Sequence, residues 1–258
     1  MRRRSRERSA RQEAWTSELS SSLALAGFLL FVLVCFTMLA MAPLASLDTY
    51  LSLGVPPPAW VSTLHLVDRV GQRAVCVPVL AAVTYLCCRH QRSWRPAWVV
   101  AAAVFALNLA VLVLKLALGR GQAGTDPSFF VGGMAYPSGH TANIVLVYGL
   151  VAYLLSRYRG VSQRVGAAMW CAVGVLAVTM VTTSLLLSWH WFADLVAGLL
   201  VGAVLLQLTV AADTALPRTA LRQSPRDALR RLSSALPRWV RRSWVRRSRS
   251  ARTTQDAS

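Results

Sequence analysis

Six long apolar stretches limit what this 258-residue chain can fold into. A helix needs about 20 apolar residues to cross about 30 Å of hydrocarbon, and each stretch approaches or exceeds that length. The second stretch is the shortest and contains Pro78. We therefore predict an all-α fold, a bundle of six transmembrane helices. The predicted spans are residues 23–42, 74–88, 97–118, 138–156, 165–187 and 190–211.

The charges lie mainly at the two ends of the chain, whose net charge is +18. Residues 1–22 carry six arginines against three glutamates, and residues 213–258 carry twelve arginines against three aspartates. A basic nucleic-acid-binding protein would carry its arginines on the folded domain, so no nucleic acid partner is expected. The predicted organisation is a basic N-terminal segment (1–22), a membrane domain (23–212) and an arginine-rich tail (213–258).

The loops between the spans predict an orientation. Residues 89–96 and 157–164 hold three arginines each, whereas the few charges of loops 43–73 and 119–137 roughly balance. The positive-inside rule places the basic loops and both termini in the cytoplasm. The preference for arginine over lysine and the lack of a cleavable signal peptide fit a bacterial plasma (inner) membrane. This integral membrane protein would then have three loops on the extracytoplasmic side.

Two segments outside the spans have helical apolar patterns. In loop 43–73, a proline run at 56–58 precedes Trp60, Leu64 and Val67, which predicts a short amphipathic helix on the outer surface. In the tail, apolar residues recur among arginine pairs. That pattern is typical either of a segment attracted to anionic lipids of the inner leaflet or of a disordered basic tail.

Polar residues inside spans are candidates for function. With the predicted topology, Lys115, His140, His190 and Asp194 all come to the extracytoplasmic face. His190 and Asp194 are four residues apart and share a helix face. The carboxylate would fix the tautomer of the imidazole and leave its other nitrogen free to attack a substrate. Alternatively, His190 is an interfacial histidine and Asp194 bonds to a neighbouring helix.

Residues 137–140, Pro-Ser-Gly-His, open the fourth predicted span. Free backbone N–H groups and the helix dipole favour an anion at such a point. Ser138 would add a hydroxyl donor, and His140 would deliver a proton to a leaving oxygen. The alternative is a helix cap without further function. The glycine-rich loop before it lies on the same side as His190, which favours a site.

These residues resemble the motifs of the type 2 phosphatidic acid phosphatase superfamily, integral-membrane branch, which is related to bacterial acid phosphatases and vanadium haloperoxidases. Residues 137–140 match its Pro-Ser-Gly-His motif. Lys115 matches the start of the first motif, in which Arg-Pro begins seven residues after the lysine. His190 and Asp194 match the end of the third, which begins with Ser-Arg. The resemblance covers about residues 23–212.

Two arginines of the family pattern are absent. Gln122 stands where the first motif has arginine, and Ser184 stands where the third motif has it. Neither side chain supplies the charge of a guanidinium that binds phosphate oxygens. We expect Arg120, in the loop after Lys115, to compensate. Arg69 or Arg73, just before the second span, are further candidates, and an ordinary interfacial arginine is the alternative for Arg120.

The resemblance implies a reaction through a phosphohistidine. His190, oriented by Asp194, attacks phosphorus; His140 protonates the departing alcohol; and water then hydrolyses the intermediate. No metal or cofactor is expected. The phosphate-binding residues that the resemblance implies, with Arg120 added as the expected substitute, are Lys115, Arg120, Ser138 and Gly139.

The predicted function is therefore an extracytoplasmic phosphatase for a lipid phosphate or a polyprenyl (pyro)phosphate. A lipid phosphotransferase, with an alcohol in place of water, is a close variant. Gln122 and Ser184 also allow a non-catalytic family member that binds phospholipid or assists envelope assembly. A small transporter fits less well, because its polar groups would lie near the bilayer midplane.

Overall fold

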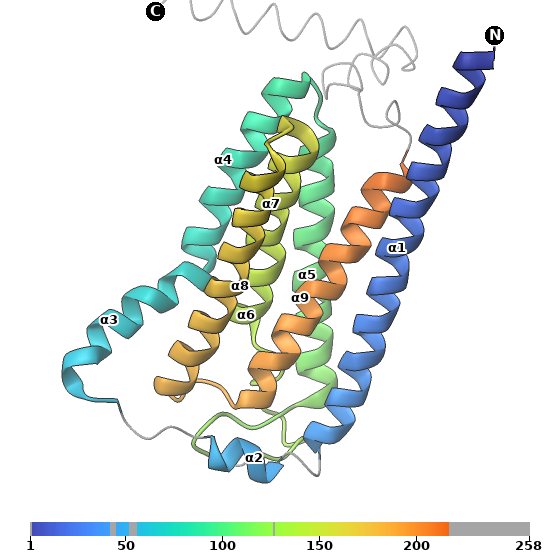
Figure 1. The fold of residues 1–258 in the computed structure, drawn as a ribbon. Helices are drawn as coiled ribbons and strands as arrows, with labels where there is room; N and C mark the ends of the chain where they lie inside the picture. Colours follow the sequence, from blue (N-terminus) through green and yellow to red (C-terminus); the bar gives the residue numbers. More distant parts are fainter. Residues whose placement is uncertain (1, 42–44, 52–55, 126, 217–258) are drawn as a thin grey trace, which may run out of the picture.

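The computed structural model describes residues 2–41, 45–51, 56–125 and 127–216, and every regular element within these residues is a helix. Six helical segments are long and apolar enough to cross a membrane, which confirms the predicted number of spans (Figure 1). The tail from residue 217 onward lies outside the described residues. The spanning segments belong to α1 (Arg2–Met41), α4 (Arg73–Gln91), α5 (Arg95–Leu118), the fourth span Gly139–Arg159, α8 (Gln163–Leu186) and α9 (Phe192–Ala215).

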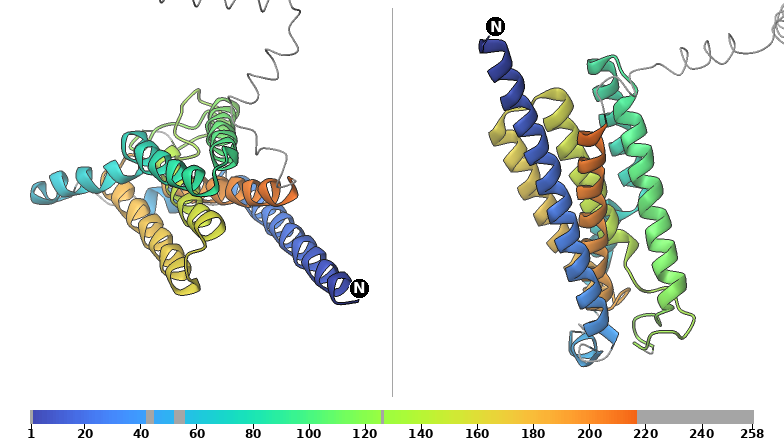
Figure 2. Two further views of the ribbon diagram at one scale, coloured as in Figure 1. Left: turned by 90° about the horizontal axis from the view of Figure 1, so that it is seen from above. Right: turned by 90° about the vertical axis from the view of Figure 1, so that its right-hand side faces the viewer.

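The fourth span is built from four consecutive helical pieces: α6 (Gly139–Asn143), η2 (Ile144–Tyr148), α7 (Gly149–Leu154) and η3 (Leu155–Arg159). In its apolar 18-residue window 56% of the residues are buried, and in that of α9 44%, whereas in the windows of the other spans at most 22% are buried. These two therefore form the centre of the bundle, and α1 runs along α9 (Figures 1 and 2). Large apolar side chains such as Phe31 and Phe105 face outward, as expected of a lipid-exposed surface.

A glycine on α9 lets the two central spans approach closely. A Cβ atom at Gly198 would collide with the Thr141 side chain and the Ser138 carbonyl of the fourth span. At this contact Thr141 Oγ1 donates to the Leu195 carbonyl over 3.0 Å, and the Ser138 amide donates to the Asp194 carbonyl over 2.9 Å. The start of the fourth span is thus held beside the start of α9.

The long first loop contains α2 (Ala45–Tyr50), α3 (Pro58–Asp68) and the short η1 (Arg69–Gly71). The predicted helix after the proline run is α3, which projects from the side of the bundle near α8 (Figure 1). Its Trp60 and Leu66 are 60% and 63% exposed. Its position on a membrane surface stays a prediction. The sequence pattern did not predict α2.

The bundle has two distinct ends. α1 begins and α9 ends at one of them, which we call the terminal end; α5 ends and α9 begins at the other, which we call the loop end (Figure 1). The connections 119–138 and 187–191 lie at the loop end. Which end faces the cytoplasm stays a prediction from the arginine distribution.

Candidate active site

The predicted site residues meet at the loop end of the bundle. Lys115 lies in the last turn of α5, Ser138 is the N-cap residue of α6, and His140 is in the first turn of α6. His190 and Lys115 both lie within electrostatic range of the His140 imidazole. Residues separated by up to 75 positions in the sequence therefore share one site.

His190 lies in the connection before α9, because the helix begins at Phe192 with Trp191 as its N-cap residue. The expectation that His190 opens the helix is thus wrong, but its pairing with Asp194 is present. Nδ1 of His190 lies 3.4 Å from Oδ2 of Asp194, which also accepts a 3.0 Å hydrogen bond from the Trp191 amide. Since Nδ1 faces the carboxylate, Nε2 is the nitrogen left for a substrate.

Arg120 is fully buried and bound on several sides. Its guanidinium donates to Oδ1 of Asp194 over 2.7 Å, to Oδ2 of Asp48 and to the Pro127 carbonyl over 3.0 Å. Its Cζ atom also lies 4.8 Å from the centre of the Phe129 ring. This departs from the expected role as a phosphate ligand, because the donors already have protein acceptors and no face of the side chain is open.

Arg120 instead organises the carboxylate beside His190. Both oxygens of Asp194 are engaged, Oδ1 by Arg120 and Oδ2 by His190 and Trp191. Asp48, from α2, completes the cluster and accepts a 2.9 Å hydrogen bond from the Ala193 amide. We call Arg120, Asp48 and Asp194 the loop-end cluster. Because a buried charge is costly without its partner, these three residues hold each other in place.

A second buried carboxylate faces His140. Oδ2 of Asp68, at the end of α3, lies 3.7 Å from Nε2 of His140 and accepts a 3.0 Å hydrogen bond from Gln72 Nε2. Its Oδ1 has no hydrogen-bond partner among the described residues. The separation exceeds a hydrogen bond, so the attraction to His140 is electrostatic. The His140 side chain is 32% exposed and therefore remains accessible.

Sequence reasoning missed Asp48 and Asp68 as functional residues. Both looked like isolated charges that balance the arginines of the first outer loop. Each partner, Arg120 or His140, is 72 residues further along the chain, so no local spacing connects them. The sequence held no usable signal, because the burial that requires a cation beside each carboxylate is visible only in the structure.

The loop that leads to the fourth span is held by contacts with α5 and α1. Lys115 Nζ donates to the Met134 carbonyl and lies 3.5 Å from the Ala135 carbonyl. The Tyr136 hydroxyl lies 2.6 Å from Thr37 Oγ1 on α1. Burial raises the pKa of Tyr136 to about 12, so this hydroxyl stays neutral near pH 7. These contacts fix the position of Ser138.

Ser138 and Ser184 present buried hydroxyls whose oxygens have no hydrogen-bond partner among the described residues. A buried hydroxyl ordinarily has a partner, so an oxygen-rich ligand is a reasonable occupant. The amide of Ser138, expected to bind phosphate, donates to the Asp194 carbonyl instead. Of the two expected amides, that of Gly139 remains, because the first N–H groups of a helix have no intrahelical acceptor.

The cationic groups that remain for a phosphate are few. Arg120 is neutralised, and Gln122 is exposed but uncharged. Lys115 and Arg73 both act electrostatically on His140. Arg73 is exposed at the first position of α4, so its side chain is free to turn toward the site. Among the described residues, no group of three or more histidine, cysteine or acidic side chains forms a candidate metal site.

Comparison with known proteins gives a family match and a structural match. The PAP2 superfamily model matches residues 96–217, which include Lys115, His140 and His190. A crystal structure described as the first transmembrane PAP2 type phosphatidylglycerolphosphate phosphatase from Bacillus subtilis superposes with a TM-score of 0.65. The two sequences are 19% identical over 76% of this chain and 98% of that one. None of the curated proteins compared with the sequence matches it.

The family match confirms the resemblance read from the three motifs, and the structural match confirms the all-helical membrane fold. Both support an integral membrane protein with the transmembrane PAP2 fold. The chain thus combines the transmembrane PAP2 fold with the sequence pattern of the PAP2 superfamily over residues 96–217.

Proposed function

We propose that this protein hydrolyses a lipid phosphate at the loop end of the bundle, through a phosphohistidine intermediate. One observation carries the proposal. Nδ1 of His190 is held 3.4 Å from a buried carboxylate, in a site that also contains His140. A nucleophile oriented by a carboxylate, with an acid beside it, is the arrangement that phosphoryl transfer through histidine needs.

In the first step, Nε2 of His190 forms a bond to phosphorus and the bond from phosphorus to the lipid oxygen breaks. His140 gives its proton to the departing oxygen, so the lipid leaves as a neutral alcohol. Asp194 stabilises the positive charge that develops on His190, and Arg120 holds that carboxylate in place.

In the second step, water attacks the phosphohistidine. His140 takes the proton from the water, the bond between nitrogen and phosphorus breaks, and inorganic phosphate leaves. Two groups of the protein then return to their starting states, His140 protonated and His190 free. An alcohol in place of water would give a phosphotransferase, the variant that the same residues support.

The phosphate oxygens would be bound by few cations and several neutral donors. Lys115 and Arg73 supply charge, and the hydroxyls of Ser138 and Ser184 and the Gly139 amide supply hydrogen bonds. Positive groups stabilise the charge of a phosphoryl transition state, and two arginines of the family pattern are missing. We therefore expect a slower reaction, or a different substrate, than a site with the full pattern has.

A lipid substrate fits the surroundings of the site. Phe130, Val131 and Met134 lie in the loop that Lys115 holds, and they are 69%, 53% and 43% exposed. Apolar side chains at this level suit acyl chains that remain in the bilayer while the phosphate enters the site. The B. subtilis protein acts, by its description, on phosphatidylglycerolphosphate, which makes that lipid a candidate here.

The positive-inside rule supports an extracytoplasmic loop end, in a bacterial inner membrane. The terminal end carries the exposed arginines Arg89, Arg92, Arg159 and Arg164, whereas at the loop end Arg120 is buried between two carboxylates and only Arg69 and Arg73, of the arginines described there, are exposed. The arginine-rich tail would then lie in the cytoplasm, where anionic lipids of the inner leaflet would attract it.

The experiment is phosphate release by purified, detergent-solubilised protein from phosphatidic acid, phosphatidylglycerolphosphate and a polyprenyl pyrophosphate. His190→Ala is the test variant. His90→Ala is its matched control, because His90 is an exposed histidine at the terminal end. We expect release from at least one substrate that is lost in His190→Ala and kept in His90→Ala.

Other outcomes separate the alternatives. Phosphate release that falls when an alcohol acceptor is added, with a phosphorylated acceptor formed, identifies a phosphotransferase. Equal background release by wild type and His190→Ala contradicts the proposal for these substrates. The alternative hypothesis of a non-catalytic lipid-binding protein, which rests on Gln122 and Ser184, would then predict lipid binding without turnover.

A further inference from the structure

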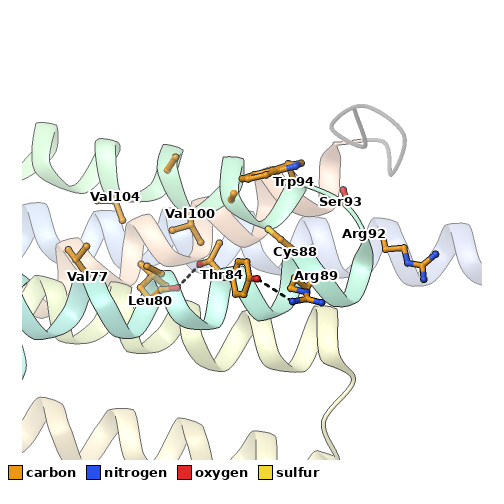
Figure 3. A pocket seen from close by; sticks show the side chains of 14 residues that line it. Val77, Leu80, Thr84, Cys88, Arg89, Arg92, Ser93, Trp94, Val100 and Val104 are labelled. Carbon is orange, nitrogen blue, oxygen red and sulfur yellow. Dashed lines mark hydrogen bonds between the residues drawn. The ribbon is translucent and has the colours of Figure 1, made fainter. Parts of the chain in front are cut away.

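A groove of about 700 Å³ lies between α4 and α5 at the terminal end, far along the bundle from the candidate active site (Figure 3). Its volume falls within the range of about 300–1,000 Å³ typical of ligand pockets. Leu80 and Val100 face each other across it, and Arg89 and Arg92 lie at its end (Figure 3). Except for Thr84, whose hydroxyl bonds back to the Leu80 carbonyl, the body of the groove is apolar.

The groove is as long as one leaflet is deep. From Val77 to Cys88 on α4 the helix rises about 16 Å, and from the N-cap residue Trp94 to Val104 of α5 the chain rises about 15 Å, at roughly 1.5 Å per residue. The hydrocarbon layer is about 30 Å thick, so each wall extends about from the interface to the midplane. A lipid chain of one leaflet has this direction and this reach.

Small side chains leave the groove open. Ala81 on α4 and Ala97 and Ala101 on α5 line it, where larger residues would fill the space between the helices. At the interface, Trp94 and Tyr85 are 49% and 60% exposed. Aromatic residues of this kind are enriched where hydrocarbon meets head groups, so the polar end of an occupant would lie at their level.

The charges at the groove entrance point to an anion. Of the three arginines in this turn, Arg95 is bound inside the protein to Asp213. Arg89 and Arg92 are exposed, and neither pairs with a carboxylate in the part of the chain that the structure describes. Arg89 Nη1 instead lies 3.3 Å from the Tyr85 hydroxyl, where it would be within reach of a phosphate at the interface.

We propose that this groove binds one anionic phospholipid of the leaflet at the terminal end, with a chain between α4 and α5 and the phosphate at Arg89 and Arg92. This lipid is distinct from the substrate, because the candidate active site lies at the opposite end of the bundle. The arginine-rich tail of the same chain does not suit the groove, since its charge repels Arg89 and Arg92.

Native mass spectrometry of the detergent-solubilised protein tests the proposal with phosphatidylglycerol and phosphatidylcholine as probes. Arg89→Gln/Arg92→Gln should weaken phosphatidylglycerol binding about 25-fold, since each arginine near a lipid surface contributes about fivefold. Binding of phosphatidylcholine should change little. Arg159→Gln/Arg164→Gln removes the same charge from the other loop of the terminal end and should leave the affinity for phosphatidylglycerol unchanged.

A second variant tests the apolar part without changing charge. Ala101→Phe fills the groove, and Ala172→Phe places the same side chain on the exposed surface of α8 as a control. Ala101→Phe should abolish phosphatidylglycerol binding in the groove, and Ala172→Phe should retain it. Phosphatidylglycerol with a photoreactive chain should label residues 77–104 in the wild type.

Equal phosphatidylglycerol affinity in wild type, Arg89→Gln/Arg92→Gln and Ala101→Phe would overturn the proposal, as would labelling spread evenly over all spans. A dimer that Ala101→Phe dissociates would also overturn it and would identify a second copy of the chain as the occupant. These readouts are independent of phosphatase activity, so they stand or fall separately from the proposed function.

Discussion

Each end of the bundle buries an arginine against aspartate, but the further residues that contact the aspartate differ between the two ends. At the loop end, Arg120 contacts Asp48 and Asp194, and Asp194 also faces His190. At the terminal end, Arg95 Nε donates to Oδ1 of Asp213 over 2.7 Å. We call Arg95, Asp213 and the two tyrosines that bond to Asp213, Tyr153 and Tyr158, the terminal-end cluster.

The partners of the two aspartates differ in chemistry. The acceptors of Asp213 are filled by Arg95 and by the hydroxyls of Tyr153 and Tyr158, at 2.6 and 2.8 Å. None of these partners readily gives up or takes a proton near pH 7. Asp194 shares its Oδ2 with an imidazole, the side-chain group that most often transfers protons in catalysis. The same pair of residue types thus joins two helices at one end and, at the other, lies beside the histidine that we propose as the nucleophile.

The largest effect should come from Asp194→Asn. An amide keeps the shape but cannot stabilise the positive charge on His190, so phosphate release should fall on the order of ten-thousand-fold, the loss seen when a carboxylate that orients a catalytic histidine becomes an amide. Steady-state phosphate release with the lipid substrates measures it. Asp213→Asn is the matched change at the other end, and an equal loss there would break the distinction between the clusters.

Asp213→Ala should act on stability and leave turnover alone. Removing one partner of a buried ion pair leaves Arg95 uncompensated and should lower the free energy of unfolding by about 3 kcal/mol. Thermal unfolding in detergent measures the loss, and kcat per folded molecule should stay at the wild-type value. A specific fall in kcat with an unchanged melting temperature would show that the terminal-end cluster serves the reaction.

Asp68→Asn tests the second carboxylate of the loop end. We expect about a tenfold fall in kcat for a lipid phosphate, a part of the 10²–10⁴-fold that general acid–base catalysis contributes. We expect this fall because the variant loses the attraction between Asp68 and the protonated His140, which lie 3.7 Å apart. A substrate with a good leaving group, p-nitrophenyl phosphate, needs less protonation and should be affected less. Equal losses for both substrates would remove Asp68 from the acid step.

The smallest effect should follow Tyr158→Phe. The variant removes one hydroxyl donor from Asp213 and should cost about 1 kcal/mol of stability, with no change in turnover. Tyr50→Phe is the control, since Tyr50 is 84% exposed. A melting temperature equal to that of the control would mean that Asp213 does not depend on the tyrosines.

Much of the fold follows from residue patterns that are local. Each span is a run of apolar residues long enough for the bilayer, so the number and order of the spans could be predicted without knowledge of the packing. The proximity of Lys115, His140 and His190 could be predicted as well, because a six-span topology places their helix ends on one side. His190 and Asp194 are close in sequence and are paired in the structure.

The partners of the charged residues could not be predicted in this way. In the sequence, Arg120 looks like an unpaired arginine of a loop. In the structure it contacts Asp48 of α2 and Asp194 of α9, and only long-range packing brings these residues together. Asp213, which the sequence analysis placed in the tail, is buried in α9 against Arg95, 118 residues earlier. Asp213 lies two positions beyond the predicted span 190–211, and nothing in the local sequence indicates that α5 will supply its partner.

The most direct test of the account is to capture the phosphorylated protein. Wild type, His190→Ala and His90→Ala would be mixed with phosphatidic acid labelled in its phosphate and quenched in alkali within the first turnover. We predict a protein-bound label in wild type and His90→Ala that survives alkali and is lost in acid, as phosphohistidine is, and no label in His190→Ala. Phosphate release by wild type without bound label, together with full activity of His190→Ala, would contradict the account.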